Sequence, residues 1–272
     1  MLKRLLSRRV IILLGKGGVG KTALAGALGI AAAGRGLRTL VMECDGRAPL
    51  ASVFGIPPGY EPREVARGLA VMTLDGQHAL EEYLGLVIPG RAILRAVTAS
   101  PLYQFFVQAA PGLRELMMLG KILYDSDRKR DSRGYHDLIV VDAPASGQAL
   151  AMLKMPEAAR ATFGDAIVGR EARNIAHLLR DANRTALVTV TTADPLAATE
   201  TIEIHEALTA LKLTPAGILF NRIPPKSFDS SALDRFRRSL APRQGATAEH
   251  LVEIAQAELD QRTFALRALD RV

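Results

Sequence analysis

The chain has 272 residues, enough for one large domain or two small ones. Hydrophobic residues make up 49% of it and charged residues 23%, a balance that excludes a disordered chain, a collagen-like chain and a coiled-coil rod. The 35 Lys and Arg against 28 Asp and Glu leave a net charge of +7, which permits weak attraction to nucleic acid or anionic lipid without establishing either. The one cysteine, Cys44, can form neither an internal disulfide nor a CxxC metal clamp, so a reducing, cytoplasmic location is expected.

The N-terminal residues 1–15 imitate a secretion signal, because basic residues precede the short apolar run Val10–Leu14. Lys16 follows where a cleavage site would need small residues, so we interpret the segment as a basic lead-in to a first strand. No apolar run approaches the ~20 residues that a membrane-spanning helix needs.

Short apolar runs alternate with helix-prone stretches, a pattern typical of a parallel sheet covered by helices. The runs are continuous rather than alternating, as in strands that are buried on both faces. The predicted strands are Val10–Leu14, Arg38–Met42, Leu69–Leu74, Leu138–Val141, Ala186–Thr191 and Ala216–Phe220. The predicted helices are Thr22–Ala33, Leu196–Leu211 and Thr247–Leu269, the last with Thr247 as a candidate N-cap. We therefore expect a single α/β domain over residues 1–272, with a mainly parallel sheet and helices on both faces.

Residues 83–124 depart from this alternation, because they are apolar and helix-prone and carry a single acidic residue, Glu115. Pro89, Pro101 and Pro111 would divide the segment into short helices. We expect a helical insertion in the α/β domain here, followed by a solvated loop over Asp125–Gly134.

A glycine-rich turn joins the first predicted strand to the first predicted helix. Its residues Gly15, Lys16, Gly17, Gly18, Val19, Gly20, Lys21 and Thr22 fit the phosphate-loop pattern GxxxxGK[ST]. Glycines let backbone N–H groups turn toward phosphate oxygens, and the helix N-terminus adds partial positive charge. Lys21 can reach the β- and γ-phosphates of ATP, and the Thr22 hydroxyl can ligate Mg²⁺. The alternative is a glycine-rich turn in which the lysine is accidental.

Lys16 is a second lysine within this loop. The segment KGGVGKT resembles the deviant Walker A class of ATPases, which includes the ParA, MinD, nitrogenase iron protein and ArsA families. The resemblance implies that Lys16 contacts nucleotide across a dimer interface, so that a second subunit, either another copy or a related ATPase chain, completes the site. A solvated surface charge is the alternative.

Four further stretches resemble the ArsA branch, which holds the arsenite-pump ATPase and the targeting ATPase for tail-anchored membrane proteins. They are LDGQHALEEYL at residues 74–84, APGLREL at 110–116, DAPASG at 142–147 and FNR at 220–222. The third is similar to the family's DTAPTGH segment, with Gln148 where the family has histidine. The resemblance spans about residues 9–225 and implies an ATPase that uses ATP and Mg²⁺.

The resemblance also assigns roles to single residues. It implies that Asp45 orients the attacking water, that Asp142 holds the Mg²⁺ shell, that Asn221 contacts adenine and that Asp194 touches nucleotide. Each has a plainer alternative: a turn aspartate for Asp45 and Asp142, a turn amide for Asn221, and an N-cap of the following helix for Asp194. Arg47 stands where the family has alanine, a departure that bears on the rate of hydrolysis.

The sequence leaves two functions open. The first is an ATP-hydrolysing dimeric switch of the ArsA type, whose helical insertion handles a hydrophobic client or a membrane-protein partner. The pairs Phe105-Phe106 and Met117-Met118 suit an adaptable apolar surface, although packing onto the sheet is the plainer explanation. The second is a ParA- or MinD-like scaffold with little hydrolysis on membrane or DNA. The basic N-terminus keeps contact with a membrane surface open, whereas nucleic acid is not expected as a partner.

Overall fold

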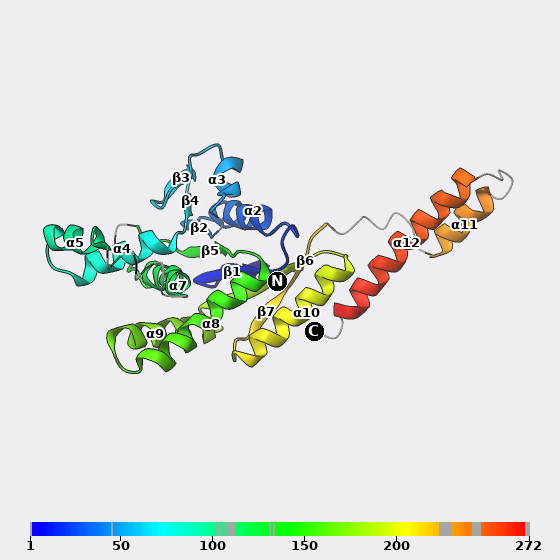
Figure 1. Cartoon of the computed structure of the whole chain (residues 1–272). Coiled ribbons are helices and arrows are strands. Elements are labelled where there is room, and N and C mark those ends of the chain that lie inside the picture. Colours follow the sequence, from blue (N-terminus) through cyan, green and yellow to red (C-terminus); the bar gives the residue numbers. More distant parts are fainter. Residues whose placement is uncertain are drawn as a thin grey trace.

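The computed structural model describes residues 2–44, 46–101, 103, 105, 107, 112–130, 132, 134–222, 230–240 and 246–269. They form an α/β structure around a seven-stranded sheet (Figure 1). Its strands are β1 (Val10–Leu14), β2 (Thr39–Glu43), β3 (Arg63–Ala66), β4 (Leu69–Thr73), β5 (Leu138–Asp142), β6 (Thr185–Thr191) and β7 (Pro215–Phe220). The strand order is β3-β4-β2-β5-β1-β6-β7, and every neighbouring pair is parallel except β3 with β4.

Helices cover both faces of this sheet. The helices of the described residues are α1 (Leu2–Leu6), α2 (Lys21–Ala33), α3 (Pro49–Val53), α4 (Gly76–Val87), α5 (Arg91–Thr98), α7 (Leu113–Ser126), α8 (Ser146–Phe163), α9 (Ile167–Arg180), α10 (Pro195–Ala210), α11 (Ser230–Leu240) and α12 (Ala246–Leu269). In β1, Val10, Ile12 and Leu14 pack into a core with α7, α8, α9 and α10. The alternate residues Ile11 and Leu13 pack into a second core with α1, α2 and α3. Because both faces are buried, β1 has no polar position.

The predicted α/β fold with a mainly parallel sheet is confirmed, and the predicted strands lie within one residue of observed strands at each end. Strand β3 was not predicted, because it is a short, largely exposed edge strand that pairs with β4 alone. The predicted N-cap at Thr247 is wrong, since Thr247 lies inside α12, which begins at Ala246. Residue preferences locate a helix start only to within a residue or two.

The helical segment between β4 and β5 is built from α4, α5 and α7. Helix α4 begins earlier than the expected boundary at residue 83, at Gly76, where the Asp75 carboxylate accepts hydrogen bonds from the backbone N–H groups of Gln77 and His78. Pro89 separates α4 from α5, and Pro101 follows the end of α5, whereas Pro111 lies outside the described residues.

The solvated loop expected from Asp125 onward is partly wrong. Helix α7 continues to Ser126, and both Asp125 and Ser126 are buried. A buried carboxylate needs a partner, and Asp125 has two, because Lys121 lies 3.3 Å and Arg128 2.9 Å from its oxygens. These ion pairs therefore allow the charged Asp125 to be buried in the last turn of α7.

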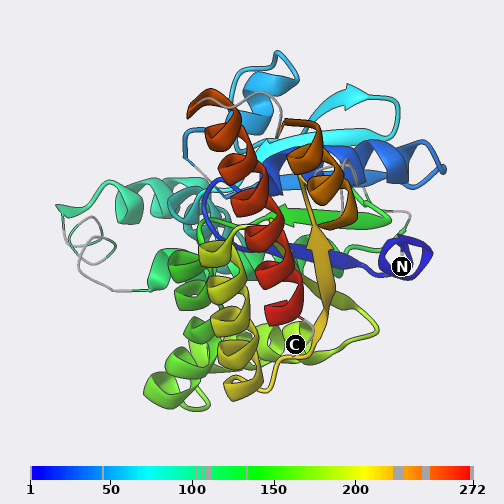
Figure 2. The same ribbon diagram turned by 90° about the vertical axis from the view of Figure 1, so that its right-hand side faces the viewer.

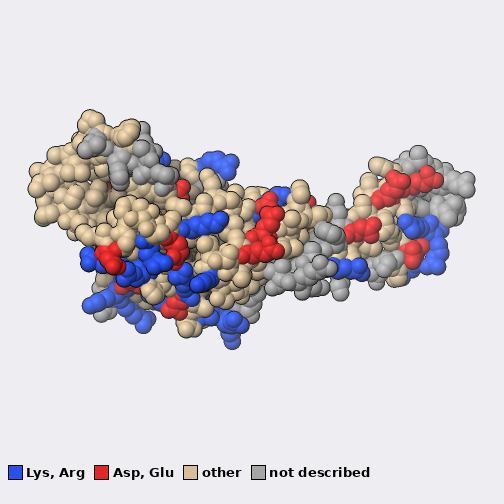
Figure 3. Space-filling view, turned by 60° about the horizontal axis from the view of Figure 1, so that its bottom comes forward, with Lys and Arg blue, Asp and Glu red and all other residues tan. Residues whose placement is uncertain are grey.

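Helices α11 and α12 pack together at the end of the molecule opposite α5 (Figure 1), and α12 runs along α10 (Figure 2). On the face shown in Figure 3, Lys and Arg side chains are interspersed with Asp and Glu rather than gathered into one basic patch. Among the helices that the structure describes, none is long and apolar enough to cross a membrane.

Candidate functional site

The glycine-rich loop lies between the C-terminal end of β1 and the start of α2. Gly15, Gly18 and Gly20 have φ angles of +140°, +86° and +93°, which side chains rarely tolerate. A Cβ atom on Gly15 would meet the Val190 carbonyl oxygen at 2.2 Å, whereas Cβ atoms on Gly17 and Gly18 would meet nothing within 4 Å. The loop is thus packed tightly against β6 at its base and is open on its other side.

Lys21 is drawn into this loop. The residue is only 8% exposed. The ammonium group donates to the Gly15 carbonyl oxygen at 2.8 Å and to the Lys16 carbonyl oxygen at 3.1 Å. The loop backbone therefore positions a buried cation where the glycines leave room for an anion.

Thr22 and Asp142 form the second polar pair of the site. Strands β1 and β5 are neighbours in the sheet, with Leu13 beside Asp142, so the residues that follow β1 meet the end of β5. The Thr22 hydroxyl donates to Asp142 Oδ2 at 2.6 Å. A hydroxyl and a carboxylate are the oxygen ligands that Mg²⁺ prefers. The donor set therefore fits the Mg²⁺ site predicted from the sequence.

A cavity of about 840 Å³ opens over these groups. Its polar lining includes Gly17, Gly18, Lys21, Thr22 and Asp142. The rest of its lining includes apolar and basic side chains from α2, from the β2–α3 segment and α3, and from the residues after β7: Ile30, Arg47, Leu50, Val53, Phe54 and Arg222. A polar cradle for phosphates beside an apolar wall suits a nucleotide, whose base and phosphates differ in the same way.

Asn221 follows β7 and reaches the loop. Its side-chain Nδ2 donates to the Val19 carbonyl oxygen at 2.8 Å, and a Cβ atom on Gly20 would meet that nitrogen at 2.3 Å. In this structure the amide braces the phosphate loop. The adenine contact implied by the resemblance stays a prediction.

Lys16 and Asp194 lie at the edge of the site. Asp194 caps α10, since its carboxylate accepts from the backbone N–H of Ala197 at 3.0 Å, which bears out the N-cap interpretation. The Lys16 ammonium lies 4.0 Å from Asp194 Oδ1 and 4.0 Å from Glu200 Oε1. Neither Lys16 nor Asp194 lines the 840 Å³ cavity. Their contacts with nucleotide therefore stay predictions.

The predicted water-orienting residue, Asp45, lies outside the described residues, but its neighbour Glu43 shows a role that sequence reasoning missed. Glu43 is fully buried at the end of β2, and its carboxylate accepts from the backbone N–H of Leu50 at 2.5 Å and of Ala51 at 3.5 Å. It thereby ties β2 to the first turn of α3. An acidic residue directly after the apolar run Leu40–Met42 is the feature that could have revealed it.

Cys44 is partly buried, and its thiol is not a reactive one. Burial, together with the nearby carboxylates of Asp142 and Glu43, raises the pKa of its thiol far above the usual range. The thiol therefore stays protonated and is a poor nucleophile and metal ligand. Over the part of the chain that the structure describes, no group of three or more His, Cys, Asp and Glu residues could hold a metal ion.

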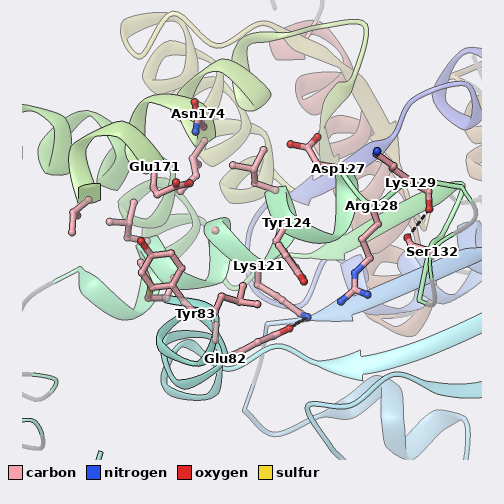
Figure 4. A pocket seen from close by; sticks show the side chains of 18 residues that line it. Glu82, Tyr83, Lys121, Tyr124, Asp127, Arg128, Lys129, Ser132, Glu171 and Asn174 are labelled. Carbon is pink, nitrogen blue, oxygen red and sulfur yellow. Dashed lines mark hydrogen bonds and ion pairs between the residues drawn. The ribbon is translucent and has the colours of Figure 1, made fainter. Parts of the chain in front are cut away.

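A second cavity, of about 590 Å³, lies between α4, α7 and α9, and sequence reasoning did not anticipate it (Figure 4). Its walls combine apolar side chains with Tyr83, Tyr124 and Glu171. Lys121 on its floor pairs with Glu82 at 2.9 Å. The cavity thus sits at the base of the helical segment rather than at the phosphate loop.

Comparison with known proteins agrees with these features. The sequence profile of the Anion-transporting ATPase family, ArsA_ATPase, matches residues 8–171, which include the phosphate loop and Asp142. ATPase BagA of Mycobacterium tuberculosis is 32% identical over 241 residues, which cover 85% of this chain and 69% of BagA. The uncharacterised protein SCO2128 of Streptomyces coelicolor is 31% identical over 153 residues, or 56% of this chain and 38% of its own length. A Chlorobaculum tepidum protein, provisionally named an arsenical pump-driving ATPase, is 27% identical over 156 residues, or 55% of this chain and 36% of its own. The profile match and the similarity to BagA show that the chain belongs to the ArsA ATPase family and is an ATPase.

Proposed function

We propose that the protein is an ATP-driven dimeric switch, in which binding of Mg·ATP closes two subunits around nucleotide and hydrolysis releases them. The proposal that the protein binds nucleotide rests on one observation. Lys21, Thr22 and Asp142 line the same cavity, at the ends of two adjacent strands. A glycine loop, a buried lysine and an oxygen pair for Mg²⁺ are the parts that phosphoryl transfer requires.

Each residue then has a defined task. Lys21 would exchange its bonds to loop carbonyls for the phosphate oxygens, where negative charge is densest. Thr22 and Asp142 would hold Mg²⁺, which supplies charge neutralisation on the phosphates. Asp45 is proposed, on the family resemblance, to orient the attacking water.

The position of Lys16 supports the dimer. Its side chain lies outside the lining of the nucleotide cavity and is held by two carboxylates at 4.0 Å. A lysine placed at the edge of its own site can serve the nucleotide of a facing subunit. That partner is a second copy or a related ATPase chain.

The helical segment is the proposed client surface. Leu86, Val87, Ile93 and Phe105 are exposed there, with Phe105 69% exposed. On the face shown in Figure 3, the tan left end of the molecule, the end where α4 and α5 lie in Figure 1, shows few charges. Exposed apolar groups that gather in one region mark an interaction surface. A hydrophobic helix from a client or membrane-protein partner is the proposed ligand.

The membrane-surface alternative finds less support. Leu5 and Leu6 of the basic N-terminal helix are buried against the sheet core, so they are not presented to a bilayer. The scaffold function on membrane or DNA therefore ranks second.

The dimer is tested by light scattering with ADP and with a slowly hydrolysed ATP analogue. We expect the wild type to dimerise with the analogue and Lys16→Ala to bind nucleotide but stay monomeric, while Lys154→Ala on the exposed side of α8 behaves as wild type. A Lys16→Ala dimer as tight as the wild type would contradict the switch.

The client surface is tested by hydrogen exchange across α4 and α5. A leucine-rich helical peptide together with the ATP analogue should slow exchange there, and Phe105→Ser should abolish this protection. Phe163→Ser, which alters another exposed phenylalanine at the end of α8, is the control. Protection that ignores nucleotide would rule out an ATP-dependent client site.

A further inference from the structure

Glu200 connects two parts of the nucleotide site without lining its cavity. It lies in the second turn of α10. Its Oε2 accepts a hydrogen bond from the Ser146 hydroxyl at 2.7 Å, and its Oε1 lies 4.0 Å from the Lys16 ammonium. One carboxylate on α10 is therefore shared between the phosphate loop and the first residue of α8.

Ser146 is directly connected to the nucleotide cavity. Asp142, Ala143, Pro144 and Ala145, the residues that precede it, all line that cavity. A movement of this segment toward a bound γ-phosphate would carry Ser146 with it. The bond between Ser146 and Glu200 is thus placed to sense which nucleotide is bound.

Lys16 is held weakly enough to be released. The side chains of Lys16 and Glu200 are 29% and 32% exposed, and that of Asp194 is 53% exposed. Exposed ion pairs of this kind shift an equilibrium by about fivefold at most, so they can break while the fold stays intact. When Ser146 no longer donates to Glu200, the Glu200 side chain regains rotamer freedom. This freedom weakens the interaction of Glu200 with the Lys16 ammonium.

We propose that Glu200 is a positioning residue that retains Lys16 within its own subunit until the Asp142–Ser146 segment moves, and then releases it toward the facing subunit. The inference rests on the proposed dimeric switch and adds its control element. It makes the availability of Lys16 depend on the γ-phosphate of the same subunit, so a subunit without ATP does not offer its lysine.

Chemical labelling of lysines tests this in the monomer. The protein is treated with an acetylating ester at a concentration at which scattering shows it to be monomeric, and the reactivity of Lys16 is read by mass spectrometry relative to the exposed Lys154. In the wild type, we expect a slow ATP analogue with Mg²⁺ to raise Lys16 labelling about three- to fivefold over ADP, the range that exposed ion pairs allow.

Three variants separate a positioning role from plain helix packing. Glu200→Gln keeps an acceptor for Ser146 but removes the charge, so Lys16 should label at the raised level without nucleotide. Ser146→Ala removes the hydroxyl that Glu200 accepts from, so Lys16 should label at the raised level without nucleotide and should no longer respond to the analogue. Glu203→Gln makes the same charge change at an exposed position of α10 and should match the wild type. Unchanged Lys16 labelling in Glu200→Gln, or an equal rise in Glu203→Gln, would overturn the proposal.

Dimerisation gives an independent readout. Glu200→Gln should dimerise with ADP several times more readily than the wild type does. If the wild type fails to dimerise with the ATP analogue, the proposed dimeric switch fails, whereas the labelling of Lys16 still decides the role of Glu200.

Discussion

The Thr22 hydroxyl donates to Asp142 Oδ2 at 2.6 Å, which joins the first turn of α2 to the end of β5. The two residues are separated by 120 positions in the chain. They meet because β5 and β1 are adjacent parallel strands, whose C-terminal ends lie at the same edge of the sheet.

Asp142→Asn should weaken Mg²⁺ binding at this site by about 10- to 100-fold, because an amide replaces a charged ligand group. We expect hydrolysis to fall by a similar factor, with a smaller loss of nucleotide affinity in the presence of a chelator. Calorimetric titration with and without Mg²⁺ measures both. Thr22→Ala should act in the same direction, and Thr199→Ala, an exposed threonine of α10, should have no effect. Equal affinities with and without Mg²⁺ in the wild type would contradict the assignment.

Glu43→Ala should lower the free energy of unfolding by about 2 kcal/mol, because it removes a charged acceptor and leaves two N–H groups of α3 without it. Urea denaturation followed by circular dichroism measures this loss. Glu203→Ala, at an exposed position, should change the stability by less than about 0.5 kcal/mol. Equal stability of the two variants would show that the β2–α3 connection does not depend on Glu43.

Asn221→Ala should reduce affinity for ATP and for GTP by a similar factor of about five, because its amide braces the Val19 carbonyl and the loop serves either nucleotide. Competition binding with both nucleotides measures the two losses in one experiment. A fall in ATP affinity alone would instead support the adenine contact implied by the family resemblance.

Lys121→Met should destabilise the protein by about 3 kcal/mol, since its ammonium is the shared partner of Glu82 and the buried Asp125. Its side chain is 7% exposed and that of Asp125 is 4% exposed, so little water would replace the lost contact. Thermal unfolding measures the effect. Lys154→Met is the control, because that lysine is exposed on α8. A melting temperature equal to that of the control would mean that the network contributes nothing to stability.

The nucleotide loop and the central strands could be predicted because their determinants are local. A continuous run such as Val10–Leu14 reports a strand that is buried on both faces, and glycines with lysine and threonine at fixed spacing report a phosphate loop. Exposed elements with weaker patterns, such as β3, gave no comparable indication.

By itself, the sequence determined the α/β fold, the order of its main elements and the identity of the loop, because hydrophobic periodicity and backbone freedom act between near neighbours. Only the tertiary structure decided that Glu43 ties β2 to α3, that Glu200 serves both Lys16 and Ser146, and that Asp125 is buried. Polar residues of this kind look the same in a sequence whether they are solvated or paired. Their roles depend on which distant strand ends and helix faces the sheet brings within hydrogen-bonding distance.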